Sequence, residues 1–149
     1  MPTLATNPRA KFDYRILETF EAGLVLAGQE VKSIKKSRMS LKGAYVTIKD
    51  HEAWLINAFV PPYQPKNAPD NYEPDRSRKL LLSKKEIRSL IGKIKQKGLT
   101  LVPLRVYTKH SLIKLEFGLG QGKRKTDKRE KIKEREAKRK MSRALKDRH

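Results

Sequence analysis

Histidines and paired carboxylates are the residues most able to carry catalysis or bind a metal, and their spacing supports neither. His51, His110 and His149 lie in predicted turns or at the terminus, without a carboxylate or second histidine at the spacing of a zinc site or catalytic triad. Glu18 and Glu21 are three positions apart on a predicted strand, so they point to opposite faces. The chain has no cysteine, which excludes disulfides and thiolate zinc sites. The sequence therefore predicts a protein that is not an enzyme and has no metal or cofactor.

Three glycines near residue 120 suggest a loop that could bind phosphate. Gly118, Gly120 and Gly122 stand at every second position, which matches neither G-x-x-x-x-G-K-[ST] nor G-x-G-x-x-G. They also follow a predicted strand and lead into a basic segment. We therefore expect a flexible hinge here rather than a nucleotide-binding loop.

The charge of the chain indicates a polyanionic partner. Lysine and arginine number 36 against 16 acidic residues, a formal net charge of +20 over 149 residues. This charge favours nucleic acid, with an acidic membrane surface as the second candidate, and it opposes self-association, so we expect a monomer. No segment has the apolar character of a targeting peptide or the roughly 18 apolar residues of a membrane span. We expect a cytoplasmic protein that does not bind membranes.

Much of the positive charge lies in residues 121–149, which carry 14 basic and 5 acidic side chains. This tail contains few apolar residues, too few to join a hydrophobic core: Ile132, Ala137, Met141, Ala144 and Leu145. Several acidic residues stand four positions before basic ones, an arrangement that stabilises a helix by about 0.2–0.5 kcal/mol per pair. We predict that residues 1–120 form one domain and that residues 121–149 are disordered alone and become helical on RNA.

The first 120 residues alternate between apolar and polar side chains in the manner of half-buried β-strands. The pattern covers five segments: Tyr14–Glu21, Ala44–Lys49, Ala53–Val60, Leu99–Thr108 and Leu112–Leu119. In the third segment four apolar residues occupy alternate positions and should share a face: Trp54, Ile56, Ala58 and Val60. Pro103 lacks a backbone N–H, which predicts an edge position or a bulge in the fourth segment.

Helix signals occur at two places. Ser83 and Glu86 have capping-box spacing, and apolar residues recur at helical intervals from there to Gly98, which predicts a helix over Ser83–Lys97. A shorter helix is expected near Gly28–Lys36. Between these helices, five prolines punctuate a stretch that should be a functional or mobile loop. The fold is therefore predicted to be mainly β, a small OB-like antiparallel barrel of about six strands with two to three flanking helices and a basic tail.

Four segments resemble one family of proteins. They agree in order and spacing with the SmpB family over nearly the whole chain, from about Asn7 to Arg143. The segments are E-A-G-L-V-L-A-G-Q-E-V-K-S from Glu21, D-R-S-R-K-L-L-L-S-K-K-E-I from Asp75, L-T-L-V-P-L-R-V-Y from Leu99, and G-K-R-K-T-D-K-R from Gly122.

The resemblance implies a function as well as a fold. In this family an OB-like barrel with attached helices binds the tRNA-like domain of transfer-messenger RNA (tmRNA, also called SsrA), and the complex enters stalled ribosomes. The nascent peptide is then tagged for degradation in the process called trans-translation. GTP hydrolysis and aminoacylation would belong to elongation factor Tu and alanyl-tRNA synthetase, which act through tmRNA.

The resemblance also assigns residues to RNA binding. Glu21, Leu81 and Lys114 match family residues that grip tmRNA. Lys114 can bind phosphate, whereas Glu21 would accept hydrogen bonds from bases or ribose, or orient a cation. Leu81 would contact an unstacked base if exposed, or pack in the core if its strand faces inward. Four further residues belong to the same signature: Gly23, Gly28, Glu30 and Lys32.

The tail carries a second set of expected contacts, with the ribosomal decoding centre and the empty mRNA channel. Asp127, Lys128 and Arg129 match the D-K-R of the family. The other residues expected to contact the ribosome are Lys123, Arg124, Lys131, Lys133, Arg135, Lys138 and Arg139. Thr126 departs from the family, which usually has an aromatic residue or histidine there that can stack on a base. Thr126 could instead serve as the N-cap of a tail helix.

Three alternatives remain open at this point. A constitutive ribosomal or initiation-type protein would share the basic charge but would not prefer tRNA-like RNA. A nuclease would need metal ligands or a poised base, which the sequence lacks. The third alternative concerns the tail, which could have no partner or could bind membranes or calmodulin. The tail lacks the bulky apolar residues of membrane-binding helices.

Overall fold

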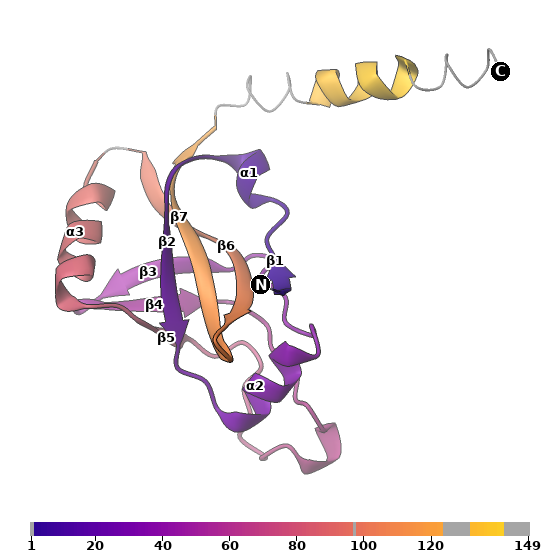
Figure 1. The fold of residues 1–149 in the computed structure, drawn as a ribbon, viewed down its shortest axis with the longest axis vertical. Helices are drawn as coiled ribbons and strands as arrows, with labels where there is room; N and C mark the ends of the chain where they lie inside the picture. The colour runs from indigo at the N-terminus through magenta and orange to yellow at the C-terminus, as the bar shows by residue number, and fades with distance from the viewer. Residues whose placement is uncertain (1, 97, 124–131, 142–149) are drawn as a thin grey trace.

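The computed structural model describes residues 2–96, 98–123 and 132–141. Its described strands form one antiparallel sheet: β1 (Thr3–Thr6), β2 (Tyr14–Leu24), β3 (Tyr45–Lys49), β4 (Glu52–Ile56), β5 (Arg78–Leu81), β6 (Leu99–Lys109) and β7 (Leu112–Gly122). Between them lie α1 (Ala10–Asp13), α2 (Gly28–Lys35), the 3-10 turn η1 (Pro65–Asn67) and α3 (Lys84–Ile94) (Figure 1). Residues 132–141 form a further helix. None of these helices combines the length and the apolar character needed to cross a bilayer.

The sheet closes on itself. Its strands follow the order β1-β6-β3-β4-β5-β2-β7, and β7 also pairs with β6, so six strands form a ring. β1, which the sequence patterns do not predict, pairs with β6 outside this ring through Arg105–Tyr107, while β3 pairs with β6 at Leu101. α2 and α3 flank different sides of the ring (Figure 1). The predicted fold, a mainly-β, OB-like barrel with flanking helices, is confirmed.

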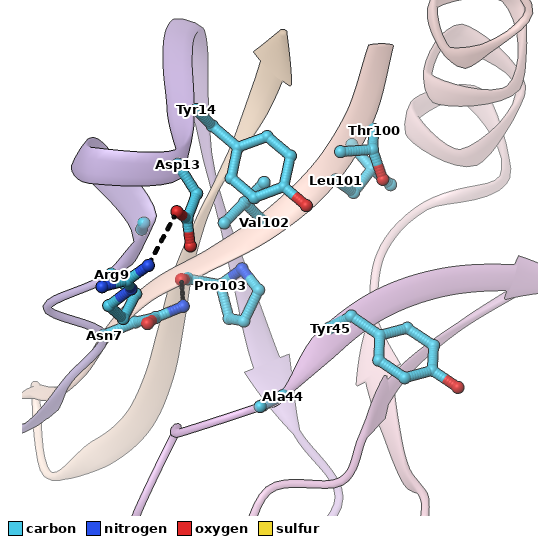
Figure 2. A pocket seen from close by; sticks show the side chains of 12 residues that line it. Asn7, Arg9, Asp13, Tyr14, Ala44, Tyr45, Thr100, Leu101, Val102 and Pro103 are labelled. Atoms are coloured by element: carbon cyan, nitrogen blue, oxygen red, sulfur yellow. Dashed lines mark hydrogen bonds and ion pairs between the residues drawn. The ribbon is translucent and has the colours of Figure 1, made fainter. Parts of the chain in front are cut away.

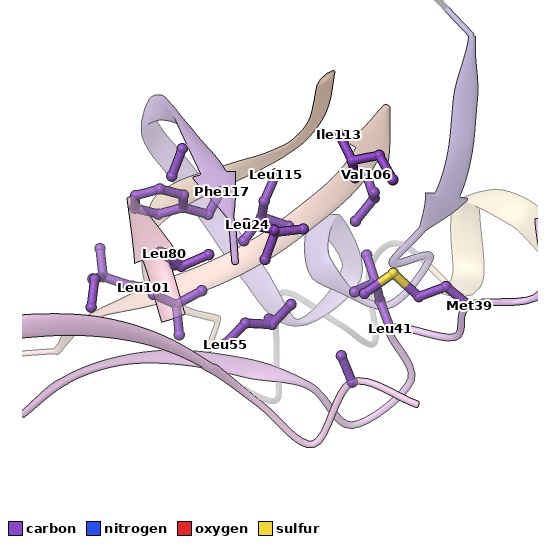
Figure 3. Close-up of a cluster of buried hydrophobic side chains, with 14 of the residues drawn as sticks. Leu24, Met39, Leu41, Leu55, Leu80, Leu101, Val106, Ile113, Leu115 and Phe117 are labelled. Carbon is purple, nitrogen blue, oxygen red and sulfur yellow. The ribbon is translucent and has the colours of Figure 1, made fainter. Parts of the chain in front are cut away.

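Inward-pointing side chains from the barrel strands form a single core, part of which Figure 3 shows. Leu24, Leu55, Leu80, Leu101 and Phe117 come from five different strands and are all buried. Burial of a large apolar side chain contributes about 1.5–3 kcal/mol. Because these leucines meet from segments far apart in the chain, closing the barrel is what creates the core.

The prediction that Trp54, Ile56, Ala58 and Val60 share one face is wrong. In β4 the residues that point inward are Ala53 and Leu55, whereas Trp54 lies on the outer face. Beyond the strand, Ala58 is fully buried. Asn57, whose φ is +62°, separates the two patterns because its left-handed backbone turns the chain. Trp54 and Ile56 therefore do not share a face with Ala58 and Val60.

The predicted glycine hinge is also wrong. Gly118 and Gly120 are buried inside β7. A Cβ on Gly118 would lie 2.8 Å from Ile16 Cγ2, and one on Gly120 would lie 3.1 Å from Tyr14 Cβ. These glycines therefore let β2 pack closely against β7. The strand continues to Gly122, two residues into the predicted tail.

Other local predictions are confirmed. The β6–β7 register shifts between Pro103 and Arg105, so the proline sits at an irregularity in the ladder. Ser83 caps α3, because its Oγ accepts the N–H of Glu86 at 3.1 Å while its own N–H donates to the Glu86 carboxylate. The helix ends at Ile94, earlier than predicted, and Gly98 has the left-handed φ of +82°.

The proline-rich stretch is tied to the body rather than extended away from it. Ser33 Oγ on α2 donates to the carbonyl of Pro61 at 2.7 Å, and Tyr72 Oη donates to the carbonyl of Val60 at 2.6 Å. Gln29 on α2 reaches the carbonyl of Asn67 at 3.2 Å. These contacts count against free motion of the loop, and its functional role stays a prediction.

Candidate nucleic-acid interface

The register of the barrel brings four predicted RNA-binding residues together. β2 lies between β5 and β7, and Gly23 stands opposite both Leu81 on β5 and Lys114 on β7. Glu21 is two residues before Gly23 on the same strand, so it points to the same, outer face. We call Glu21, Gly23, Leu81 and Lys114 the grip face. Its members come from three strands.

Leu81 is exposed, which excludes the core position that its sequence left open, and contact with a base stays a prediction. Its side chain is 56% accessible, whereas the neighbouring Leu80 is buried in the core. A Cβ on Gly23 would lie 3.3 Å from Leu81 Cδ1, so the glycine leaves room for the leucine to lie across β2. An exposed leucine beside a cation suits an unstacked base with its phosphate.

A shallow pocket of about 210 Å³ lies beside Leu81 and Lys114. Leu26, between β2 and α2, and Val31 on α2 line it together with Leu112. Leu112 is also highly exposed, at 59%. Leu112 was not among the predicted site residues. Its place beside a predicted turn and before the inward-facing Ile113 nevertheless indicated an exposed leucine.

Glu21 is held as a carboxylate by its neighbours. Tyr107 Oη donates a hydrogen bond to one Glu21 oxygen, and Lys109 Nζ lies 3.4 Å from the other. The hydrogen bond from Tyr107 is the main reason that the pKa of Glu21 lies below its usual range, and the charges of Lys109 and Lys114 act in the same direction. Glu21 thus orients the Lys109 cation and stays an ionised hydrogen-bond acceptor.

Tyr107 is a further residue of this site that sequence analysis did not identify. It stands opposite Lys114 on β7, which places it in the same row across the sheet as the grip face. Burial, followed by the nearby Glu21 carboxylate, raises the pKa of Tyr107 to about 12, so its hydroxyl stays protonated and donates. The guanidinium of Arg105 lies 4.2 Å from the centre of its ring. The alternation of Arg105, Tyr107 and Lys109 on one strand was the signal available.

Glu30 has a different role from the one predicted. Its side chain is fully buried. One carboxylate oxygen lies 2.7 Å from the guanidinium of Arg78, the other accepts the N–H of Ala27 at 2.8 Å, and Arg76 also donates to the carboxylate. A buried carboxylate surrounded in this way cannot contact RNA directly. Its position is therefore structural.

We call Glu30, Arg76 and Arg78 the clasp. Arg78 is itself fully buried and also donates to the carbonyls of Ala58, at 2.8 Å, and Pro74, at 2.9 Å. Burial raises the pKa of Glu30, but the hydrogen bonds from Arg76 and Ala27 and the charge of Arg78 outweigh it, and the pKa lies below its usual range. The clasp joins α2 to β5 and to the end of the proline-rich stretch.

The other two signature residues lie on α2, which borders the grip face. Lys32 is exposed, and its Nζ lies 5.8 Å from the centre of the Tyr63 ring, so it remains available to phosphate. Gly28 is the first residue of the helix, and a Cβ there would meet nothing within 4 Å. The structure shows that Lys32 is exposed and that a Cβ on Gly28 would meet no local steric obstacle.

The tail residues divide into three groups. Lys123 is joined to α1, because its Nζ donates to the carbonyl of Lys11 at 2.8 Å and its N–H donates to the carbonyl of Asp13 at 2.9 Å. Four predicted contact residues lie on the helix 132–141, whose residues are all exposed: Lys133, Arg135, Lys138 and Arg139. The remaining predicted positions lie outside the described residues: Arg124, Thr126, Asp127, Lys128, Arg129 and Lys131.

A larger pocket, of about 460 Å³, lies between α1, β3 and β6 (Figure 2). The ring of Tyr14 lies over the lining residues, whereas the ring of Tyr45 projects away from them. Its charged residues, Arg9 and Asp13, pair with each other at 3.2 Å, and Asn7 donates to the carbonyl of Pro103 at 2.9 Å. This internal pairing makes the pocket a weaker site for a polyanion than the grip face. Over the described parts of the chain, no cluster of three or more His, Cys, Asp or Glu could hold a metal.

Comparison with known proteins agrees with this geometry. A family model described as SmpB protein matches residues 4–147. The SsrA-binding proteins of Trichodesmium erythraeum and Thermosynechococcus vestitus are 52% and 50% identical to this chain. Their alignments cover 96% and 97% of the chain, and 92% and 95% of the relatives.

A solved structure described as "tmRNA-SmpB: a journey to the center of the bacterial ribosome" has the same fold. It is 44% identical, with a TM-score of 0.67, and the match covers 85% of this chain and 92% of that chain. The relatives are named for binding an RNA and not for catalysis. The chain therefore belongs to the SmpB family, whose members are RNA-binding proteins rather than enzymes.

Proposed function

We propose that this chain binds the tRNA-like domain of tmRNA through the grip face and brings it to stalled ribosomes for trans-translation. The observation that carries the proposal is the row across the sheet, in which Tyr107, Lys114, Gly23 and Leu81 stand opposite one another on four neighbouring strands. The row supplies a cation and an exposed apolar side chain, and Glu21, two residues before Gly23 on β2, adds an ionised acceptor beside it. These three chemistries suit phosphate, an unstacked base and a base amino group or ribose hydroxyl.

The tail has a separate role in this proposal. Its cations would occupy the small-subunit decoding centre and the empty mRNA channel, where polyanionic ribosomal RNA surrounds them. The exposed helix 132–141, with Lys133, Arg135, Lys138 and Arg139, supports a role in electrostatic contact. The protein acts as a monomer in this scheme. Elongation factor Tu and alanyl-tRNA synthetase reach it through the tmRNA.

The test is a titration of the full-length protein with the tRNA-like domain of tmRNA and with a structured control RNA of equal length. We expect tight binding that prefers the tRNA-like domain. A chain ending at Lys123, which retains the whole of β7, should keep that preference. Equal binding to both RNAs, with loss of binding on truncation, would indicate a nonspecific basic tail or a constitutive ribosomal protein.

The grip face is tested by Glu21→Gln. We expect this variant to lose affinity for the tRNA-like domain by about 1.5–3 kcal/mol, because a charged hydrogen-bond acceptor is lost. Glu73→Gln is the matched control, since Glu73 is exposed in the proline-rich stretch and is not a member of the grip face. If both variants bind like the wild type, Glu21 has no part in recognition.

A further inference from the structure

Helix α3 carries a line of cations that the grip face does not use. Lys84, Arg88, Gly92 and Lys95 stand at positions i, i+4, i+8 and i+11, which places them on one face of the helix and its C-cap. All four are exposed, and the buried residues of α3, Ile87 and Leu90, lie on another face. The line extends about 16 Å along the helix axis. We call these four residues the α3 stripe.

The three cations of the stripe are electrostatically unbalanced. Within the described residues, none of Lys84, Arg88 and Lys95 forms an ion pair. Lys93 on the same helix provides the contrast: its Nζ lies 2.8 Å from Glu18 and 5.1 Å from the centre of the Phe20 ring. The fold thus neutralises the cation that faces the barrel and leaves the three stripe cations, with the exposed Lys85 beside them, for an anionic partner.

Gly92 gives a second, independent indication of a partner. A glycine inside a helix destabilises it relative to alanine. A Cβ on Gly92 would meet nothing within 4 Å, so packing inside the molecule does not require a glycine here. Its φ is not in the left-handed region, so backbone conformation does not require one either. A partner that approaches the helix closely between Arg88 and Lys95 would explain the missing side chain.

We infer that the α3 stripe binds the sugar-phosphate backbone of the same RNA that the grip face recognises. Lysine and arginine side chains along a helix suit phosphates, and close approach at Gly92 suits a backbone rather than a splayed base. The stripe also continues the grip face along the chain, because Leu81 stands two residues before Ser83, the N-cap of α3. This inference rests on the proposed function.

The test compares two full-length triple variants of equal charge. One is Lys84→Gln/Arg88→Gln/Lys95→Gln. The control is Lys42→Gln/Lys49→Gln/Lys66→Gln, whose lysines are also exposed and form no ion pair among the described residues. We expect the stripe variant to bind the tRNA-like domain about tenfold more weakly or worse. Its slope of log affinity against log salt should fall by about two, and the control's by less than about one.

Gly92 is tested separately. Gly92→Ala should raise the melting temperature, and Gly92→Leu should weaken binding to the tRNA-like domain severalfold while circular dichroism shows a folded barrel. Wild-type binding by Gly92→Leu, equal losses in the two triple variants, or a loss confined to binding of ribosomes without tmRNA would overturn the inference. If the wild type fails to prefer the tRNA-like domain over the control RNA, the proposed function fails instead, so the two failures are distinguishable.

Discussion

The grip face and the clasp each contain a glutamate from the same signature segment, Glu21 and Glu30. The pKa of each carboxyl lies below its usual range, yet for different reasons: a tyrosine hydroxyl acts on Glu21, whereas two guanidinium groups and a backbone N–H oppose burial at Glu30. Glu21 is partly exposed on the grip face, and Glu30 is fully buried against Arg78. The comparison shows that two glutamates of one signature occupy opposite environments, one facing solvent on the grip face and one joining α2 to β5 from inside.

The largest effect should follow a break in the clasp. Glu30→Gln leaves the guanidinium of Arg78 buried without a counter-charge, so we expect the free energy of unfolding to fall by about 3–5 kcal/mol. Urea denaturation would measure this change. Glu52→Gln removes one partner of the exposed Lys79 pair, and it should change stability by less than about 1 kcal/mol. Similar losses in both variants would contradict the distinction between clasp and surface pair.

Leu80 and Leu81 are neighbours on β5, one buried and one exposed, and they test the same difference between support and surface contact. Leu80→Ala should lower the free energy of unfolding by about 2–5 kcal/mol, because Leu80 is buried in the core. Leu81→Ala should change it by less than about 1 kcal/mol, since Leu81 is exposed. Leu81→Ala should nevertheless weaken binding to the tRNA-like domain. Denaturation and RNA titration of both variants would test this reversal, and a large stability loss in Leu81→Ala would count against an exposed contact residue.

A smaller effect is expected at the hydroxyl that holds Glu21. Tyr107→Phe should weaken RNA binding by about 0.5–1.5 kcal/mol, because the carboxylate loses its fixed donor. The pKa of Glu21, measured by NMR titration of its side chain, should rise toward its ordinary value. Tyr72→Phe removes a hydroxyl that donates to the carbonyl of Val60, away from the grip face, and serves as the control. Equal RNA affinities of the two variants would argue against positioning by Tyr107.

The smallest expected effect is a pH dependence of stability from the clasp. In the unfolded chain a glutamate has a pKa of 4.5, and Glu30 has a lower one in the folded protein. The stabilisation that the Glu30 carboxylate provides is therefore complete above pH 4.5. This stabilisation is lost as the pH falls from 4.5 through the pKa of Glu30 in the folded protein. Denaturation across a pH series from about 3 to 7 should show a steeper acid loss in the wild type than in Glu30→Gln. Parallel curves would mean that Glu30 does not titrate differently on folding.

Local patterns in the sequence predicted a large part of this molecule. The capping box at Ser83, the irregularity near Pro103 and the inward alternation of β7 each depend on residues close together in the chain. The barrel class followed from the number and length of such strands. The grip residues themselves came from a family resemblance, and the register of β2 with β5 and β7 supports their grouping.

Other features depended on contacts between distant segments, and the sequence alone could not decide them. Glu30 and Tyr107 look like ordinary polar positions until α2 meets β5 and the barrel brings Glu21 of β2 to Tyr107, because burial and pairing then fix their roles. Gly118 and Gly120 resemble a hinge until β2 packs against them. Charge, alternation and capping are properties of neighbours along the chain, so the sequence determined them. Register, burial and the pKa of each carboxylate depend on which strands and helices lie side by side. These properties therefore follow from the folded barrel and not from neighbours along the chain.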